Sequence, residues 1–492
     1  MALSKLLDVV KSSSVDNWTK RNKEAFSSLF GADEGRYPQG ASQAVTVRAP
    51  EMKTDSGVPF AAYIHPSNPP SGAYSGTSFV IFPAIEESRP CLIGMGVGTQ
   101  GLSPDESILG RSGHSRKIGA ICRWLNHAFG MGKRVAWAKQ DPTRTDIELP
   151  EDVKMEWPEY KPALEKYSRE MYALFRPSDN NEATLAALTA FLDLLFAERG
   201  FGSLAKWNAD AQKLSATWME YLMPAVSCEE LKSLLALRRY AILQGPPGTG
   251  KTKMAVDLLE KEYHSFGRSV QFHANTTYEN FVGGLAPDYA PNEHGLQFRP
   301  SPGVLMEAAN QASREPSRPY LLHIDEINRA DLGKVLGEAI FLLEAATDSD
   351  RKISLPYDFG EPFHRLLGIP KNLHILGTMN SADRSIAIVD IAVRRRFAFL
   401  SLWPRVSVVQ QNGCQLMQDA FQQLMSIFVE HASEDAFALV PGHSYFLEKD
   451  EERAKQRLKS ELAPLLQEYL LQGYVGGFAE PIRSYLQRLD SL

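Results

Sequence analysis

A glycine-rich segment near the middle of the chain, residues 245–252, constrains the fold more than any other feature. It reads GPPGTGKT, which fits the phosphate-loop pattern G-x-x-x-x-G-K-[ST]. An apolar run, residues 240–243, precedes it, and residues 253–262 carry apolar side chains at helical spacing. A strand, a glycine loop and a helix in this order point unpaired backbone N–H groups at an anion. The segment therefore predicts an α/β nucleotide-binding core rather than a chance glycine turn.

Each residue of this loop has an expected role. Lys251 would reach the β- and γ-phosphates of a nucleotide, and the Thr252 hydroxyl would hold Mg²⁺. The rest of the loop is expected to form the cradle around the phosphates: Gly245, Pro246, Pro247, Gly248, Thr249 and Gly250.

A second apolar strand, residues 319–324, ends in two adjacent acids, Asp325 and Glu326. Phosphoryl transfer depends on a metal ion, a positioned water and positive charge at the γ-phosphate. We expect Asp325 to hold the metal and Glu326 to activate the attacking water. Two acids at a strand end also suit a solvated turn, but their place downstream of the glycine loop favours the catalytic interpretation.

A third strand, residues 373–379, ends in Asn380, which we expect to position the same water. Asp383 and Arg384 follow shortly after and are expected to hold a subunit interface.

Three consecutive arginines, residues 394–396, come next in the chain. Arg395 or Arg396, with Arg394 as a less favoured candidate, is expected to complete the site of a neighbouring subunit. Such an arginine finger accelerates hydrolysis by roughly 10³–10⁵. The alternative interpretation of the run is a solvated basic corner.

Together these motifs resemble the AAA+ motor subunit of McrBC-type restriction systems, the McrB family. The matching segments, in chain order, are 245–252, 272–273, 278–285, 324–330, 337–338, 377–385, 394–397 and 442–446. The string M-N-x-x-D-R-S at 379–385 is the most discriminating of them. The resemblance covers residues 225–490 and leaves the N-terminal part unassigned.

The resemblance implies that the chain hydrolyses GTP or ATP with Mg²⁺ and forms a homo-oligomer, expected to be a hexamer. It also implies an McrC-like nuclease subunit, since the chain shows no nuclease motif of its own. We therefore expect the motor of an McrBC-like restriction or antiphage defence complex. The alternative from another class is a MoxR-like chaperone that remodels proteins without nucleic acid, and the string at 379–385 favours the first.

Composition and periodicity, taken together with the resemblance to the McrB family, predict an α/β protein with four segments. They are a mixed α/β target-recognition domain at 1–150, a linker and helical connector at 151–225, an AAA+ P-loop core with a largely parallel sheet at 226–404, and a helical lid at 405–492. Within the first two segments we expect strands near 45–48, 60–64, 78–82 and 91–98, and helices over 167–175 and 184–198. In the core, the pair Gly283-Gly284 predicts a turn, residues 332–343 predict a helix, and residues 353–355 predict part of an inserted hairpin. In the lid, His443 or Ser444 is expected to face the nucleotide, and the alternative is that His443 and Tyr445 pack at a domain joint.

The N-terminal part contains a basic stretch between Arg111 and Lys139, with seven basic residues and no acid. Trp124, Phe129 and Trp137 are interleaved, so the stretch suits phosphate contacts and base stacking. An equally concrete alternative is a helix that buries an apolar face at 118–125 and leaves its charges in water. A protein partner is the third possibility.

The remaining composition narrows the class of protein. The formal net charge is −6, and the four cysteines are far apart. No apolar run approaches the roughly 20 residues that a membrane span requires, and the N-terminus lacks a signal-peptide core. We expect a cytoplasmic protein with reduced cysteines and no membrane partner.

Overall fold

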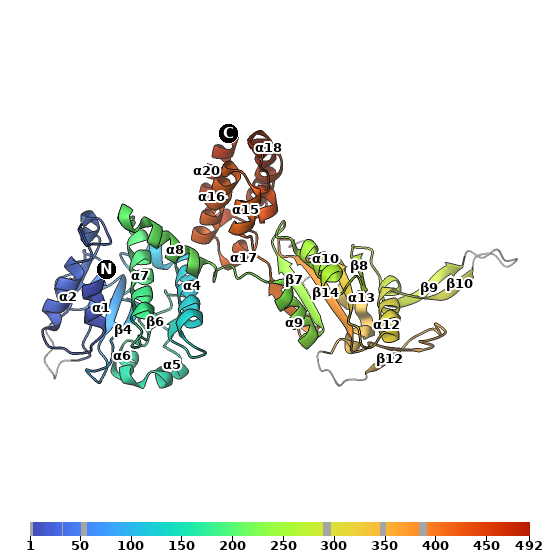
Figure 1. Cartoon of the computed structure of the whole chain (residues 1–492), viewed down its shortest axis with the longest axis horizontal. Coiled ribbons are helices and arrows are strands. Elements are labelled where there is room, and N and C mark those ends of the chain that lie inside the picture. Colours follow the sequence, from blue (N-terminus) through green and yellow to red (C-terminus); the bar gives the residue numbers. More distant parts are fainter. Residues whose placement is uncertain (1–2, 32, 51–56, 289–296, 345–350, 383–390) are drawn as a thin grey trace. The chain divides into compact units, whose positions relative to one another are not determined.

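The computed structural model describes the chain except for residues 1–2, 32, 51–56, 289–296, 345–350 and 383–390. The chain forms two compact units. Unit 1 comprises residues 1–223 with 429–433, and unit 2 comprises 224–428 with 434–492. Figure 1 traces the helices and strands of both units.

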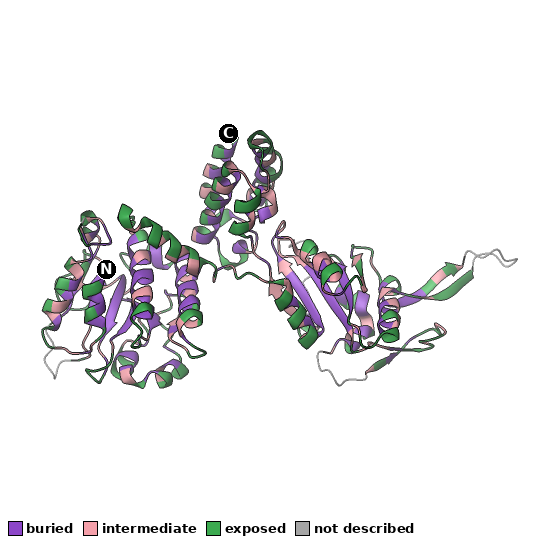
Figure 2. Cartoon of the chain, in the orientation of Figure 1, coloured by how far each residue is buried: buried purple, intermediate pink, exposed green. Residues whose placement is uncertain are grey.

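Unit 1 is built on an antiparallel six-stranded sheet with the strand order β1-β2-β3-β4-β6-β5. Its strands are β1 (Thr46–Arg48), β2 (Ala61–Ile64), β3 (Thr77–Phe82), β4 (Leu92–Val97), β5 (Ala136–Ala138) and β6 (Met171–Phe175). All residues of β3, β4 and β6 are buried, and the sheet appears purple between helices that are exposed on their outer sides in Figure 2. The expected strands in this part of the chain are therefore confirmed.

Helices cover both faces of this sheet. On one face, α5 (Glu151–Glu156) and α6 (Lys161–Lys166) pack through Val153, Trp157 and Leu164. The other elements of unit 1 are α1 (Ser4–Val10), α2 (Trp18–Ser27), α3 (Glu106–Leu109), α4 (Ser112–Phe129), α7 (Asn181–Ala197) and α8 (Asn208–Met219), with short 3₁₀ turns at Gln39–Gln43, Pro158–Tyr160 and Ala205–Trp207. Asn180 caps the start of α7, since its side chain accepts hydrogen bonds from the N–H groups of residues 182 and 183, as an N-cap should.

The helix expected over residues 167–175 is wrong, because Met171–Phe175 forms strand β6. The run is apolar throughout, so its periodicity cannot distinguish a doubly buried strand from a buried helix. β6 lies between β4 and β5, so the sheet is completed only after residue 170. The compact unit accordingly runs to Met223, and the boundary expected at residue 150 does not coincide with its end.

Unit 2 is built on a five-stranded sheet with the strand order β15-β7-β14-β11-β8, in which all neighbours are parallel. Its strands are β7 (Tyr240–Gly245), β8 (Gly267–Gln271), β11 (Tyr320–Asp325), β14 (Leu373–Asn380) and β15 (Ala398–Ser401). The parallel sheet predicted from the alternation of strands and helices is confirmed.

Alternate residues of the strands face two separate helical layers. Ala241 and Leu243 pack against α9 (Cys228–Arg238) and α10 (Lys251–Lys261). Ile242 and its neighbours pack on the opposite side, against α12 (Val304–Arg314) and α13 (Leu332–Leu336). This three-layer arrangement gathers the carboxyl ends of β7, β14 and β11 at one edge, where ligands bind in open α/β sheets.

Two hairpins are inserted into this core. The first pairs β9 (Gly283–Asp288) with β10 (Gln297–Pro302), and the second pairs β12 (Lys352–Ser354) with β13 (Leu366–Gly368). The expected hairpin near 353–355 is confirmed, whereas the turn expected at Gly283-Gly284 is wrong, because both residues begin β9. A Cβ on Gly284 would lie 2.4 Å from the Cγ of Glu279, so close packing against α11 (Tyr278–Phe281) requires this glycine. The helix expected over 332–343 ends at Leu336 and continues as a 3₁₀ turn, Gly337–Leu342.

The C-terminal part of unit 2 is helical, as expected for a lid. Its helices are α15 (Val406–Asn412), α16 (Gln415–His431), α17 (Glu434–Phe437), α18 (Glu451–Arg457), α19 (Ala463–Leu471) and α20 (Ala479–Asp490), drawn in orange to red in Figure 1. Residues 429–431 at the end of α16 belong to unit 1. The Phe421 and Phe446 rings meet edge-on at 5.1 Å. Of the helices in the described residues, none combines the length and hydropathy needed to cross a bilayer.

Candidate nucleotide-binding site

The glycine loop connects β7 to α10 through backbone that only glycine adopts readily. Gly248 and Gly250 have φ angles of +79° and +82°, in the left-handed region where a Cβ is strained. Gly250 precedes Lys251, the first residue of α10. The expected sequence of strand, loop and helix is therefore present, with the positive end of α10 directed into the loop.

Lys251 is folded onto its own loop. Its Nζ donates hydrogen bonds to the carbonyl oxygens of Gly245 at 2.9 Å and Pro246 at 2.7 Å. Burial lowers the pKa of Lys251 to about 8, against the opposing attraction of Asp325 and Glu326. The ammonium is thus a partly desolvated cation, and such a group gains more from an anion than an exposed lysine does.

The carboxylate of Asp325 ties three elements together at the edge of the sheet. Its Oδ1 accepts a hydrogen bond from the Thr252 hydroxyl of α10 at 2.9 Å and another from the Thr378 hydroxyl of β14. The Thr378 oxygen in turn accepts the backbone N–H of Glu326 at 3.2 Å. A hydroxyl has one donor and two lone pairs, so Thr252 can donate to Asp325 and still offer oxygen to a cation.

Glu326 follows directly and has a left-handed backbone, with a φ of +51°. Its Oε2 lies 2.5 Å from the Nε of Arg329, and its carbonyl accepts the Arg329 N–H at 2.8 Å. The Glu326 carboxylate, which we expect to act as the base, is therefore paired with Arg329, three residues later in the chain. Asn328 of the same turn is buried.

Asn380 lies at the same edge, next to the start of the glycine loop. It is in register with Gly245 across β14 and β7, and the N–H of Ser381 donates to the Gly245 carbonyl at 2.9 Å. The Asn380 side chain accepts the N–H of Ala382 at 3.1 Å. The structure thus brings Asn380 to the edge that carries Lys251 and Asp325. There its amide oxygen is used in the hydrogen bond from Ala382.

The three arginines differ in what they contact. Arg394, the last residue of α14 (Ile391–Arg394), places its guanidinium over the Phe399 ring, and Arg396 donates to the Ala392 carbonyl at 2.7 Å. Arg395 is exposed and makes no side-chain bond to any residue that the structure describes. Asp383 and Arg384, expected at a subunit interface, lie outside the described residues.

Three residues at this edge had no role in the sequence analysis: Thr378, Arg329 and His323. Thr378 lies two residues before Asn380 and His323 two before Asp325, so strand alternation places each on the same face as its partner. The alternation of side chains along each strand was the sequence signal that could have identified Thr378 and His323. Burial lowers the pKa of His323, so its ring is neutral at neutral pH.

The lid touches the glycine loop through backbone atoms. The N–H of Gly442 donates to the Pro247 carbonyl at 2.9 Å, and the N–H of Ser444 donates to the Gly248 carbonyl at 3.0 Å. A Cβ on Gly442 would lie 2.1 Å from the carbonyl carbon of Gly248. Only glycine therefore allows this approach.

His443 lies between these two contacts, in the 3₁₀ turn His443–Phe446. Its Nδ1 accepts the N–H of Arg405 at 3.3 Å, and burial lowers its pKa to about 4. Its Nε2 lies 3.8 Å from the position of a Cβ on Gly250. His443 thus packs at the joint and also faces the loop, so the two expectations for it are compatible.

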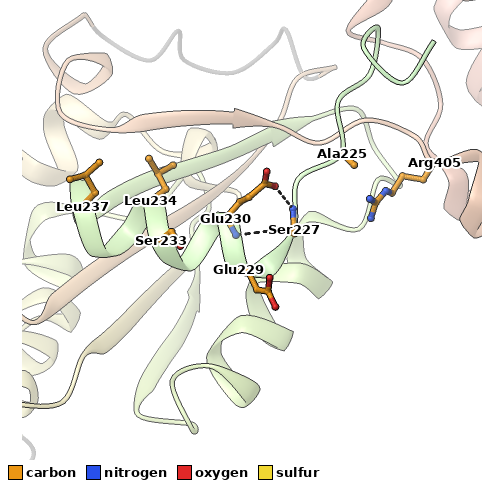
Figure 3. A pocket seen from close by; sticks show the side chains of 8 residues that line it. All are labelled: Ala225, Ser227, Glu229, Glu230, Ser233, Leu234, Leu237 and Arg405. Atoms are coloured by element: carbon orange, nitrogen blue, oxygen red, sulfur yellow. Dashed lines mark hydrogen bonds between the residues drawn. The ribbon is translucent and has the colours of Figure 1, made fainter. Parts of the chain in front are cut away.

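An open hollow begins beside Arg405 and follows α9 (Figure 3). The residues lining it are Ala225, Ser227, Glu229, Glu230, Ser233, Leu234, Leu237 and Arg405. Ser227 and Glu230 form a capping box, in which each side chain bonds to the other residue's N–H. Because Arg405 also contacts His443, one end of the hollow adjoins the lid segment that touches the glycine loop.

The oxygens of Thr252 and Asp325 fit a magnesium site. In the described part of the chain, no group of three His, Cys, Asp or Glu side chains converges as a metal cage would. Mg²⁺ prefers oxygen ligands and keeps several waters, with one or two protein ligands and phosphates completing its shell. The Thr252 hydroxyl and the Asp325 carboxylate supply that limited set of hard oxygens.

The basic stretch of unit 1 is largely engaged within the protein. Its apolar face at 118–125 is buried in α4, which confirms the helix interpretation for this face. The expectation that the charges of this helix stay in water is wrong for Arg116 and Lys117, which are buried. The Lys117 ammonium pairs with Glu198 at 2.9 Å, and Lys139 donates to three backbone carbonyls. Arg123 and Lys133 are exposed. Several of the charges that suggested a phosphate-binding surface therefore hold the fold instead.

The geometry above defines an AAA+ domain, and residues 241–397 match the AAA domain of the dynein-related subfamily. Over 272 residues the chain is 34% identical to the EcoKMcrB subunit of a type IV methyl-directed restriction enzyme from Escherichia coli K12, covering 51% of this chain and 58% of the relative. The resemblance to the McrB family predicted from the motifs is thus confirmed.

A second curated relative is also a restriction component. The chain is 27% identical over 203 residues to component YdiS of the type II restriction enzyme BsuMI from Bacillus subtilis 168, covering 34% of this chain and 57% of that protein. The chain spans less than three-fifths of the length of either relative. Among solved structures, a RuvB mutant from Thermotoga maritima matches with 13% identity and a TM-score of 0.25, over 51% of this chain and 79% of that one.

We expect the affinity for nucleotide to fall as the pH rises through about 8, because the buried Lys251 loses its charge there and phosphate binds the charged form. Titration with a fluorescent nucleotide from about pH 7 to about pH 9 measures this. Lys251→Met should weaken binding by about 10–100-fold and remove the pH dependence. Lys253→Met, which alters an exposed lysine two residues further on, should preserve both. A pH-independent wild-type affinity would contradict this role of Lys251.

We expect Gly442→Ala to weaken nucleotide binding, because the added Cβ would separate the lid from the Gly248 backbone. Overpacking of this kind costs roughly 1–3 kcal/mol. Gly477→Ala is the matched control, since a Cβ there meets no atom within 4 Å. Nucleotide affinity and melting temperature should be measured for both variants. Equal affinities would show that the lid contact does not support binding.

Proposed function

We propose that this chain is an NTP-hydrolysing motor subunit of a restriction system that works with a separate nuclease subunit. The observation that carries the proposal is the cluster at the edge of the unit 2 sheet. There Asp325 accepts hydrogen bonds from Thr252 and Thr378, and Lys251 lies in the glycine loop beside them. Both curated relatives are components of restriction enzymes, which favours this function over a protein remodeller.

In the proposed reaction, Lys251 binds the β- and γ-phosphates while Thr252 and Asp325 hold Mg²⁺, whose charge offsets that of the phosphates. Glu326 accepts a proton from the attacking water, and Asn380 orients that water. Arg329 engages only Oε2 of Glu326, at 2.5 Å, and a carboxylate has a second oxygen that can accept the proton. GTP and ATP are both candidate substrates. We propose that the nucleoside end lies toward Arg405 and the hollow along α9, because the Arg405 backbone N–H bonds to His443, beside the lid residues that contact the glycine loop.

We further propose that the subunits form a ring, expected to be a hexamer, in which one subunit completes the site of the next. Arg395 is the best finger candidate, because it is exposed and makes no side-chain bond within the described residues. A head-to-tail arrangement is the symmetry in which every finger meets a site. Asp383 and Arg384 are proposed to hold the same interface.

Unit 1 is proposed to sense the target, and an McrC-like nuclease to cut it. Any contact between unit 1 and nucleic acid would depend on exposed cations such as Arg123 and Lys133, since Lys117 and Lys139 are buried in internal bonds. Binding through phosphate contacts weakens steeply with salt.

We expect Glu326→Gln to bind nucleotide as the wild type does and to hydrolyse it about 10²–10⁴-fold more slowly, because the amide cannot accept the proton. Phosphate release under single-turnover conditions measures the effect. Glu307→Gln, which removes a half-exposed acid on α12 that pairs with Arg268, serves as the control and should turn over normally. A Glu326→Gln variant with wild-type turnover would exclude Glu326 as the base.

We expect Arg395→Ala and Glu326→Gln to be inactive separately and to recover activity when mixed. In an equimolar random ring, roughly a quarter of the interfaces pair an intact base with an intact finger. Arg394→Ala should be tested in the same way as a control, since its guanidinium is occupied by Phe399. An Arg395→Ala variant that is fully active alone, or a mixture that stays inactive, would overturn the assignment.

A further inference from the structure

One polar side chain interrupts the otherwise apolar interior of β11. His323 is fully buried, with 0% of its surface exposed, between Leu322 and Ile324. It lies two residues before Asp325, so both side chains are on the same face of the strand. Its ring therefore lies behind the carboxylate that the proposed function assigns to the metal.

The two ring nitrogens of His323 have different surroundings. Nδ1 lies 2.8 Å from the hydroxyl of Ser269, its register partner on β8. Nε2 lies 3.9 Å from Oδ1 of Asp325 and has no hydrogen-bond partner in the described part of the chain. Buried polar atoms are nearly always bonded, so this nitrogen is available for a hydrogen bond to the Asp325 carboxylate.

A neutral imidazole carries one proton, and the bond at one nitrogen decides where it sits. When the Ser269 hydroxyl donates to Nδ1, the proton lies on Nε2 and faces the carboxylate. A hydrogen bond from nitrogen to oxygen is about 2.9 Å long, so a movement of about 1 Å by the Asp325 carboxylate would form it. Such a bond would hold the carboxylate in one orientation and leave the Thr252 lone pairs available to a cation.

We propose that His323 is a positioning residue for the magnesium site, acting through Asp325 as a hydrogen-bond donor that Ser269 orients. The inference rests on the proposed nucleotide site and adds a role for a residue that contacts neither phosphate nor metal. Partners of this kind fix the direction of a ligand's lone pairs, and their loss weakens metal binding by about 10–100-fold.

The neighbouring strand supplies a matched control. His374 on β14 is also buried, and its Nδ1 lies 2.6 Å from the Tyr263 hydroxyl. It pairs in register with Leu321, two residues before His323. His374 is therefore a buried histidine with a hydroxyl partner, further from the end of the sheet that carries Asp325.

The experiment measures the affinity for a fluorescent nucleotide over a range of Mg²⁺ concentrations and in EDTA. It compares the wild type with His323→Leu, His323→Gln and His374→Leu, and melting temperatures are recorded for all four. We expect His323→Leu to bind nucleotide normally in EDTA but to need about 10–100-fold more Mg²⁺ for half of the magnesium effect. His323→Gln should restore most of the response, because its amide nitrogen can donate from the place of Nε2. His374→Leu should lower the melting temperature and leave the Mg²⁺ midpoint unchanged.

The outcomes test the positioning role of His323 separately from the proposed nucleotide binding. A folded His323→Leu variant with the wild-type Mg²⁺ midpoint overturns the positioning role, as does an equal shift in His374→Leu. A wild type that binds no nucleotide, with or without Mg²⁺, refutes the proposed function itself. If His323→Leu does not fold, Ser269→Ala decides: it changes an exposed residue, and an unshifted Mg²⁺ midpoint overturns the role.

Discussion

The candidate site depends on one carboxylate oxygen, Oδ1 of Asp325, which holds three separate segments of the chain in place. It accepts the hydroxyls of Thr252 from α10 and Thr378 from β14 while its own backbone closes β11. An anionic acceptor strengthens both bonds, so the start of the helix and the ends of two strands keep a common geometry. Lys251 and Glu326 are each adjacent in sequence to a member of this group, and their positions follow from it.

The lid is joined to this edge by backbone bonds to the glycine loop and by the Ser381 hydroxyl, which donates to the Ala438 carbonyl at 2.8 Å. Two N–H groups of residues 442–444 bond to two carbonyls of the glycine loop, so any movement of the lid acts directly on the loop that would hold the phosphates. Side chains can change rotamer and absorb a displacement, whereas backbone contact without a Cβ between transmits it. Two backbone hydrogen bonds therefore couple the position of the lid to that of the glycine loop.

The parallel sheet, the lid and the residues of the glycine loop could be predicted from sequence because their signals are local. A glycine pattern, an apolar run and an acid at its end each lie within a few adjacent residues. The bonds from Thr378 to Asp325 and from Arg329 to Glu326 were not predicted, because they depend on which strands become neighbours and on a left-handed residue at position 326. The strand Met171–Phe175 was missed for a third reason: burial on both faces removes the alternation that identifies a strand.

Strand β6 comes late in the sequence but lies inside the sheet of unit 1, and this affects where the chain can be truncated. A fragment that stops at residue 150 lacks the strand that sits between β4 and β5, so the long edge of β4 would be left open in the middle of the sheet. Open apolar edges recruit strands from other chains, and such a piece would self-associate. A cut after Met223 leaves every strand of that sheet with its partner.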